Sequence, residues 1–265
     1  MDKIRIVLFD LETLPNLQEA LKKWTQLGNW PFRTMKATVT SVICAGWKVY
    51  GSRETHCINA WDYPKRWKKD VNDDYEVCKA IYEVLKTCDV VVTHNGKKFD
   101  WKFLQTRLLF HGLPVLPKIL HVDTVELARR NLFAFSNRLG DIGETFVNEK
   151  KLQHTGWQLW VDTYNKCPKA LNLMERYCKQ DVKLLEKVFI KLMPFVKNMP
   201  NRNRYRTVKQ IEEGTRVCPT CGEDKLQKNG MKHTTMNSMQ RYRCRAEKCG
   251  ATCYTNASGN NPRAM

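Results

Sequence analysis

The sequence of 265 residues predicts an α/β domain with a mixed sheet, followed by a small metal-stabilised segment. Two observations predict the domain: strand-like runs come first, and further strand-like runs then alternate with stretches of helical period. A third observation separates the C-terminal part. After Met199 the chain becomes polar and basic, and five of the eleven cysteines lie close together there.

The strands and helices are expected in a definite order. Residues 4–9 form a continuous β-branched run, typical of a strand that is buried on both faces. Residues 38–50 and 54–61 predict two more strands, joined by a turn at Gly51-Ser52. Helical and strand patterns then alternate: helices over 75–88 with an N-cap among 72–74, 99–110, 125–132, 136–146 (capped by Ser136) and 170–192, and strands over 89–93 and 119–123.

The composition divides the chain into four regions. We expect a main domain over residues 1–197, a linker over 198–215, a cysteine-containing segment over 216–256 and a disordered tail over 257–265. The linker contains the run NRNRYR at 201–206, which is polar and basic and has little to bury.

The charge of the chain points to a polyanionic partner. Lysine and arginine number 45 against 27 acids, a net charge of +18. Such a charge favours nucleic acid through counterion release, although a solvated basic surface is the simpler alternative. No apolar run approaches a membrane span and no signal-peptide pattern begins the sequence, so we expect a cytoplasmic protein without membrane association. The six cysteines before residue 200 are expected to be packing residues.

Acidic residues occur in two motifs of the main domain. Asp10 and Glu12, in FDLET, are two residues apart, so on a strand they share a face. Asp100, in HNGKKFD, follows a strand end, where open α/β sheets place their ligand sites; the alternative is an ordinary acidic residue at a helix N-terminus. Carboxylate oxygens are the ligands that Mg²⁺ and Mn²⁺ prefer.

A third motif, YCKQD, adds a phenol and another acid. Tyr177 and Asp181 are four residues apart and share a face of the predicted long helix. Asp181 can then bind a metal ion while the Tyr177 hydroxyl orients a water molecule. A half-buried tyrosine beside a surface aspartate is the alternative.

The three motifs, in this order, resemble those of the DEDD superfamily of RNase H-like 3′→5′ exonucleases, and Tyr-x-x-x-Asp resembles its tyrosine subtype. The stretches HVDTVELARR, FSNRLGDIGETF and HTGWQLW resemble exonuclease proteins of phages and mobile elements. The resemblance covers residues 4–195. It implies an RNase H-like sheet of five strands in the order 3-2-1-4-5, flanked by helices, with the second strand antiparallel.

The resemblance also implies a mechanism. Two Mg²⁺ (or Mn²⁺) ions would be held by Asp10 as the bridging ligand, with Glu12 and Asp181 at one ion and Asp100 at the other. Tyr177 would align the water, and nucleoside 5′-monophosphates would leave from DNA or, less favoured, RNA. Four residues are expected to contact the terminal nucleotide or support the site: Leu11, Thr13, Asn95 and Phe99.

Other interpretations stay open. His94 is expected to be structural, and Asp123 to cap a helix or support the site. The chain could instead be a structure-specific endonuclease on the same fold, or a non-catalytic nucleic-acid-binding adaptor. A protein partner in a replication or repair complex is compatible with either.

The C-terminal cysteines follow the spacing C-x₂-C-x₂₂-C-x₄-C, in which two short knuckles can hold one structural Zn²⁺. The expected ligands are Cys218, Cys221, Cys244 and Cys249, with Cys253 or His233 as a possible replacement. The segment resembles zinc ribbons attached to DNA-handling proteins. Its cations and aromatic residue suit nucleic-acid contact, with a solvated basic face as the alternative: Lys225, Lys228, Arg241, Tyr242 and Arg243.

Overall fold

The computed structural model describes residues 4–15, 40–196, 213–235, 238–247, 249–255 and 262–264. Its main body is a mixed five-stranded sheet of order β3-β2-β1-β4-β5. β1 pairs antiparallel with β2 and parallel with β4, so the predicted fold class and strand order are confirmed. The strands are β1 (Ile6–Pro15), β2 (Thr40–Val49), β3 (His56–Asn59), β4 (Val90–Thr93) and β5 (Leu120–Asp123).

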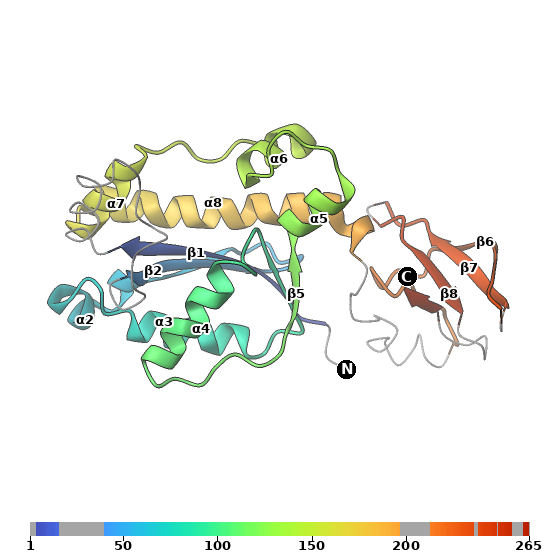
Figure 1. Ribbon diagram of the computed structural model, residues 1–265, viewed down its shortest axis with the longest axis horizontal. Helices are drawn as coiled ribbons and strands as arrows, with labels where there is room; N and C mark the ends of the chain where they lie inside the picture. The colour runs from blue at the N-terminus through green and yellow to red at the C-terminus, as the bar shows by residue number, and fades with distance from the viewer. Residues whose placement is uncertain are drawn as a thin grey trace.

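Helices cover both faces of this sheet (Figure 1). Helices α3 (Tyr75–Leu85) and α4 (Asp100–Phe110) lie on one face, and the 25-residue α8 (Pro168–Leu192) runs along the other. The remaining helices are α2 (Pro64–Lys69), α5 (Thr124–Asn131), α6 (Leu139–Val147) and α7 (Trp157–Tyr164), with short 3₁₀ turns at Ala60–Asp62 and Met193–Phe195. The sequence pattern does not predict α2 or α7.

The core lies on both sides of β1. Val7 and Phe9 belong to the hydrophobic cluster that includes residues of α3 and α4. Ile6 and Leu8 belong to a second cluster, built mainly on α8. This alternation is what a central strand buried on both faces requires, and it places every second residue of β1 opposite α8.

Helix α8 lies unusually close to β2. A Cβ atom at Gly46 would stand 2.8 Å from Val182 Cγ2 and 2.9 Å from the carbonyl oxygen of Cys178. The Lys48 ammonium also reaches the Glu186 carboxylate at 2.5 Å. The backbones of β2 and α8 are therefore in direct contact at Gly46.

Several boundaries differ from the sequence predictions. β1 continues beyond Phe9 because its pairing with β2 extends to Pro15, so Asp10 lies inside the strand rather than after its end. A β-bulge interrupts the pairing after Glu12. α6 begins at Leu139 because the Ser136 hydroxyl contacts the Asp141 carboxylate instead of capping the helix as expected.

The C-terminal part forms a second, antiparallel sheet of order β6-β7-β8-β9. Its strands are β6 (Leu226–His233), β7 (Ser238–Cys244), β8 (Thr252–Thr255) and β9 (Pro262–Ala264). β9 pairs with β8 inside the segment 257–265, for which the sequence predicts a disordered tail. Most of the predicted linker, 198–215, lies outside the described residues. Among the described helices, none combines the length and apolar character needed to cross a membrane.

Candidate active site

Three of the four predicted carboxylates meet. One oxygen each of Asp10, Glu12 and Asp181 lies within 4.8 Å of the other two. Asp10 and Glu12 alternate along β1 and share the face that α8 covers, and Asp181 comes from α8 itself. Acids separated by more than 160 residues of sequence are thus brought together by one helix crossing one strand.

Asp100 approaches the same region from the other motif. It is the first residue of α4 and is buried, although it lies outside the three-carboxylate group as the described residues define it. Burial, followed by the charge of Asp10, raises the pKa of Asp100 well above its usual value. The four acids therefore share one electrostatic environment.

The cluster resists ionisation in the absence of a cation. Burial and then the charge of Asp181 raise the pKa of Asp10 to about 7. Burial and the charges of Asp10 and Asp181 raise the pKa of Glu12 well above its usual value. A divalent cation among these oxygens would reverse both effects, because it replaces lost hydration and opposes the mutual repulsion.

One atom of the cluster tests whether a metal ion would fit. Asp181 Oδ1 is buried, and the described part of the chain offers it no hydrogen-bond partner. Buried carboxylate oxygens normally have such a partner, so we expect a ligand such as a metal ion or a water molecule to contact this oxygen. With three carboxylates converging, the donor set suits a hard divalent cation such as Mg²⁺ or Mn²⁺.

A lysine that the sequence analysis missed lies against this cluster. The Lys151 ammonium contacts the Asp181 carboxylate and donates a hydrogen bond to the Tyr177 hydroxyl at 3.0 Å. Burial raises the pKa of Tyr177, and the charge of Asp181 raises it further, so the phenol is neutral. His154 packs edge-to-face on the Tyr177 ring, with centroids 4.8 Å apart.

The cluster opens into a cavity of about 410 Å³. Asp10, Asp181 and Lys151 are among the residues that line it. Further lining residues come from the ends of β4 and α5 and from the loop before α6; the polar ones are His94, Asn95, Arg129, Asn137 and Arg138. The cavity thus combines carboxylates that can hold cations with arginines that can hold phosphate.

His94 and Asp123 hold the second motif in place. The two ring nitrogens of His94 contact Thr124 Oγ1 at 2.8 Å and the Asn137 carbonyl at 2.9 Å. Burial lowers the pKa of His94 to about 4, so the ring is neutral at pH 7. The Asp123 carboxylate caps α5 by accepting a hydrogen bond from the backbone amide of Val125. It also accepts hydrogen bonds from the backbone amides of Asn95 and Lys97. These contacts fix the turn that leads to Asp100.

The four predicted nucleotide-contacting residues divide into two pairs. Asn95 lines the cavity, and Phe99 is 43% exposed and stacks on Phe103. Leu11 and Thr13 are only 5% and 6% exposed. Leu11 alternates with Asp10 and Glu12 and packs into the hydrophobic core. Contact of Leu11 and Thr13 with the terminal nucleotide stays a prediction.

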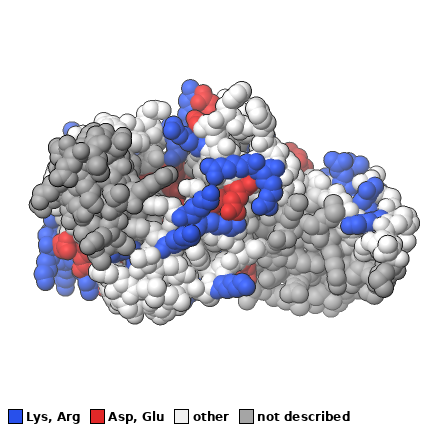
Figure 2. Space-filling view, viewed as in Figure 1, with Lys and Arg blue, Asp and Glu red and all other residues white. Residues whose placement is uncertain are grey.

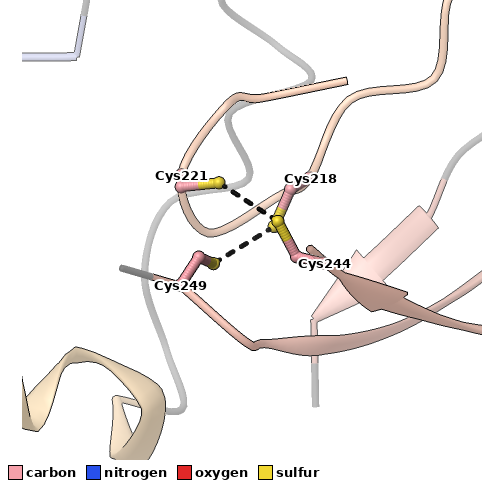
Figure 3. A group of neighbouring side chains, drawn as sticks. All are labelled: Cys218, Cys221, Cys244 and Cys249. Carbon is pink, nitrogen blue, oxygen red and sulfur yellow. Dashed lines mark hydrogen bonds between the residues drawn. The ribbon is translucent and has the colours of Figure 1, made fainter. Parts of the chain in front are cut away.

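The C-terminal cysteines converge as the spacing predicts (Figure 3). The Sγ atoms of Cys218 and Cys249 are 3.7 Å apart, those of Cys221 and Cys244 are 3.5 Å apart, and all four lie within 4.8 Å of one another. Zn–S bonds of about 2.3 Å around a tetrahedral ion place sulfur atoms at similar separations. Cys253 is buried outside this group, and His233 contacts Ser238 instead. The cluster is compatible with a zinc ribbon.

The basic residues of this segment are only partly available to a ligand. Lys225, Lys228 and Arg243 are exposed. Tyr242 is 5% exposed, and its hydroxyl accepts a hydrogen bond from Arg216 Nη1 at 2.6 Å. Base stacking by Tyr242 and phosphate contact by the exposed cations stay predictions.

Three of the cysteines expected to be packing residues also meet. The Sγ atoms of Cys44, Cys57 and Cys178 lie within 4.8 Å of one another. Cys44 pairs across the sheet with Glu12, so the thiols adjoin the carboxylate cluster. Hydrogen bonds from Cys178 and Cys44 lower the pKa of Cys57 to about 5.

The strand order and the carboxylate cluster together define a nuclease-type α/β domain. The sequence profile of the RNase_H superfamily matches residues 43–193, more than half of the chain, and the chain belongs to this superfamily. That match begins after the first motif, so the placement of Asp10 and Glu12 depends on the structure.

One curated relative is a DNA polymerase of Methanocaldococcus jannaschii, 26% identical over 139 residues. The similar region covers 44% of this chain and 8% of the polymerase, so the chain spans less than a tenth of that relative's length.

Proposed function

We propose that this chain is a metal-dependent 3′→5′ exonuclease that hydrolyses terminal phosphodiester bonds and releases nucleoside 5′-monophosphates. The observation that carries the proposal is the meeting of Asp10, Glu12 and Asp181 within 4.8 Å around an unpartnered Asp181 oxygen. The motif order supports the exonuclease class. The similarity to a protein named DNA polymerase supports DNA over RNA as the substrate.

The carboxylates would hold the metal ions, and neighbouring side chains would handle water and phosphate. Asp10, Glu12, Asp181 and Asp100 would bind two Mg²⁺ or Mn²⁺ ions, which supply Lewis-acid activation of water and charge stabilisation at the leaving oxygen. Tyr177, a neutral phenol four residues from Asp181, is placed to hold the attacking water by a hydrogen bond.

Cations of the chain complete the site. The Lys151 ammonium, beside Asp181 and Tyr177, offers a positive charge to the scissile phosphate. Arg129 and Arg138 also line the cavity and would contact the preceding phosphates. On the face shown in Figure 2, lysine and arginine side chains gather around an acidic patch over α5, which carries Arg129 and Arg130 in its last turn.

The cysteine cluster would bind one structural Zn²⁺ and stabilise a small sheet whose core is little more than the thiols themselves. Its exposed cations would then hold nucleic acid at a distance from the carboxylates. In this arrangement the main domain would cleave the substrate, and the ribbon would increase the affinity for nucleic acid.

The test uses the full-length protein with Mg²⁺ and 5′-labelled DNA and RNA, each single- and double-stranded. Stepwise shortening from the 3′ end, with mononucleotide products, is expected on DNA. The Asp181→Asn variant should lose this activity, whereas Glu144→Gln, at an exposed acid outside the cluster, should keep it.

Other products would contradict the proposal in different ways. Internal cuts that release oligonucleotides would replace it with a structure-specific endonuclease. Tight binding without Mg²⁺-dependent cleavage would replace it with a binding adaptor.

A further inference from the structure

The loop that joins α5 to α6 carries two solvent-exposed phenylalanines. Phe133 is 90% exposed and Phe135 is 100% exposed, the highest values among the large hydrophobic residues that the structure describes. The two rings lie edge-to-face with centroids 5.5 Å apart. Ala134 between them is half-buried, so this short segment turns both rings outward on the same side. We refer to residues 132–138 as the aromatic loop.

The aromatic loop is attached to the catalytic cavity at both ends. Arg129 precedes it and Asn137 and Arg138 end it, and all three line the cavity that contains Asp10 and Asp181. The Asn137 carbonyl is held by His94 at 2.9 Å. Two residues span at most about 7 Å, so Phe135 lies at the mouth of the cavity.

Exposure of two neighbouring aromatic rings to water is unfavourable and indicates a surface that a ligand covers. The residues around the rings indicate the chemical class of that ligand. Arg129, Arg130 and Arg138 are all exposed on the loop or beside it, and the chain carries a net charge of +18. An apolar protein surface would leave these cations without counter-charges. A nucleic-acid strand satisfies both features, because it has phosphates for the arginines and flat bases for the rings.

We propose that Phe133 and Phe135 form a stacking platform for unpaired bases of the strand whose end enters the carboxylate cavity. The inference rests on the proposed nuclease function and extends it by naming the substrate form. Bases inside a duplex present only their edges, and they cannot stack on the two rings. The site therefore selects strands that are single-stranded close to the reacting end.

The test distinguishes the contribution of base contacts to binding from that of phosphate contacts. Binding of the full-length protein is measured by fluorescence anisotropy in buffer without Mg²⁺ or Mn²⁺, which prevents turnover and leaves the proposed structural Zn²⁺ in place. One probe is a short single-stranded DNA, and the other is the same strand with abasic sugars at its 3′-terminal positions. The double variant Phe133→Ala/Phe135→Ala should bind the intact strand about tenfold more weakly, since base–aromatic stacking contributes at least this much for two bases. Its affinity for the abasic strand should match that of the unmodified protein.

Two controls support the reading of this result. Phe110→Ala removes another exposed phenylalanine, 55% exposed on α4, and should leave both affinities unchanged. Arg129→Ala should lower the affinity for both probes by the same factor and reduce the salt dependence of binding, because it removes a phosphate contact. Equal loss on both probes in the double variant, or no loss on either, would overturn the stacking platform.

The experiment also separates this inference from the function on which it rests. The double variant should still cleave a dinucleotide with Mg²⁺, because so short a substrate does not need the loop. If the unmodified protein cleaves nothing, the nuclease proposal fails. If it cleaves but the double variant binds the intact strand normally, only the aromatic loop has been misassigned.

Discussion

Replacing Asp10 with asparagine should stabilise the metal-free protein while it abolishes cleavage. The reason is the repulsion inside the carboxylate cluster, where the pKa of Asp10 is raised from 3.8 to about 7 by burial and by the charge of Asp181. Asparagine keeps the shape of the side chain but never ionises. It therefore removes both the cost of burying a charge and one ligand of the proposed metal site.

The size and pH dependence of the effect follow from the pKa. Below pH 4 the aspartate is neutral in the folded and unfolded states, and the substitution should change little. As the pH rises to about 7 the unfolded chain loses this proton while the folded protein keeps it, so the unmodified protein loses stability. A difference of about three pKa units corresponds to about 4 kcal/mol. Because the buried amide keeps its own desolvation cost, we expect a net gain of about 2 kcal/mol at pH 8.

Urea unfolding without added Mg²⁺ or Mn²⁺, at pH 5 and pH 8, measures this gain. The variant should be more stable at pH 8, and the difference should shrink at pH 5. Added Mg²⁺ should stabilise the unmodified protein more than the variant. Glu144→Gln, at an exposed acid, serves as the control. A variant that is less stable at pH 8 without these metal ions, or a gain that is the same at both pH values, would refute the reasoning.

Three further predictions concern other parts of the site. Tyr177→Phe should lower the single-turnover cleavage rate about 10- to 100-fold with only a small change in melting temperature, because it removes the hydrogen bond to water and the one from the Lys151 ammonium, which keeps its contact with Asp181; an unchanged rate would remove this residue from the mechanism. Cys221→Ser should abolish stoichiometric zinc, measured by metal analysis, and expose residues 213–255 to proteolysis while the main domain keeps its melting transition; full zinc content would contradict the ligand assignment. With its pKa lowered to about 5, Cys57 should be alkylated by iodoacetamide at pH 6 about tenfold faster than the half-buried Cys167, as peptide mass spectrometry would show, and equal rates would count against a thiolate.

The sequence predicts the sheet well because its signals are strong and local. β-branched runs mark the strands, and FDLET, HNGKKFD and YCKQD place acids where strand and helix geometry can bring them together. The end of β1 was harder to predict. Asp10 and Glu12 are polar residues in a strand, and only the pairing of Pro15 with Thr40 shows that the strand continues through them.

Other features of the site give no clear signal in the sequence. Leu11 and Tyr242 each alternate with residues of the opposite face, and their burial follows from the period of two of a strand, which the motifs do not express. Lys151 is one of two adjacent lysines between motifs, and no spacing distinguishes it from a surface cation. Its position against Asp181 depends on the path of the chain between α6 and α7, which only tertiary structure sets.

The absence of a side chain at Gly46 limits how far α8 can move from the sheet before the carboxylate cluster is disrupted. Ordinary carbon contacts require about 3.5–4 Å, so an added methyl group, 2.8 Å from Val182 and 2.9 Å from Cys178, would push the helix outward by roughly half an ångström or more. Asp181 and Tyr177 would travel with that helix, and Asp10 and Glu12 would stay behind on the sheet. A displacement of about this size already reaches the limit within which the proposed metal ligands must be held. The hydrogen atom of Gly46 thus sets the distance between the carboxylates of the strand and those of the helix.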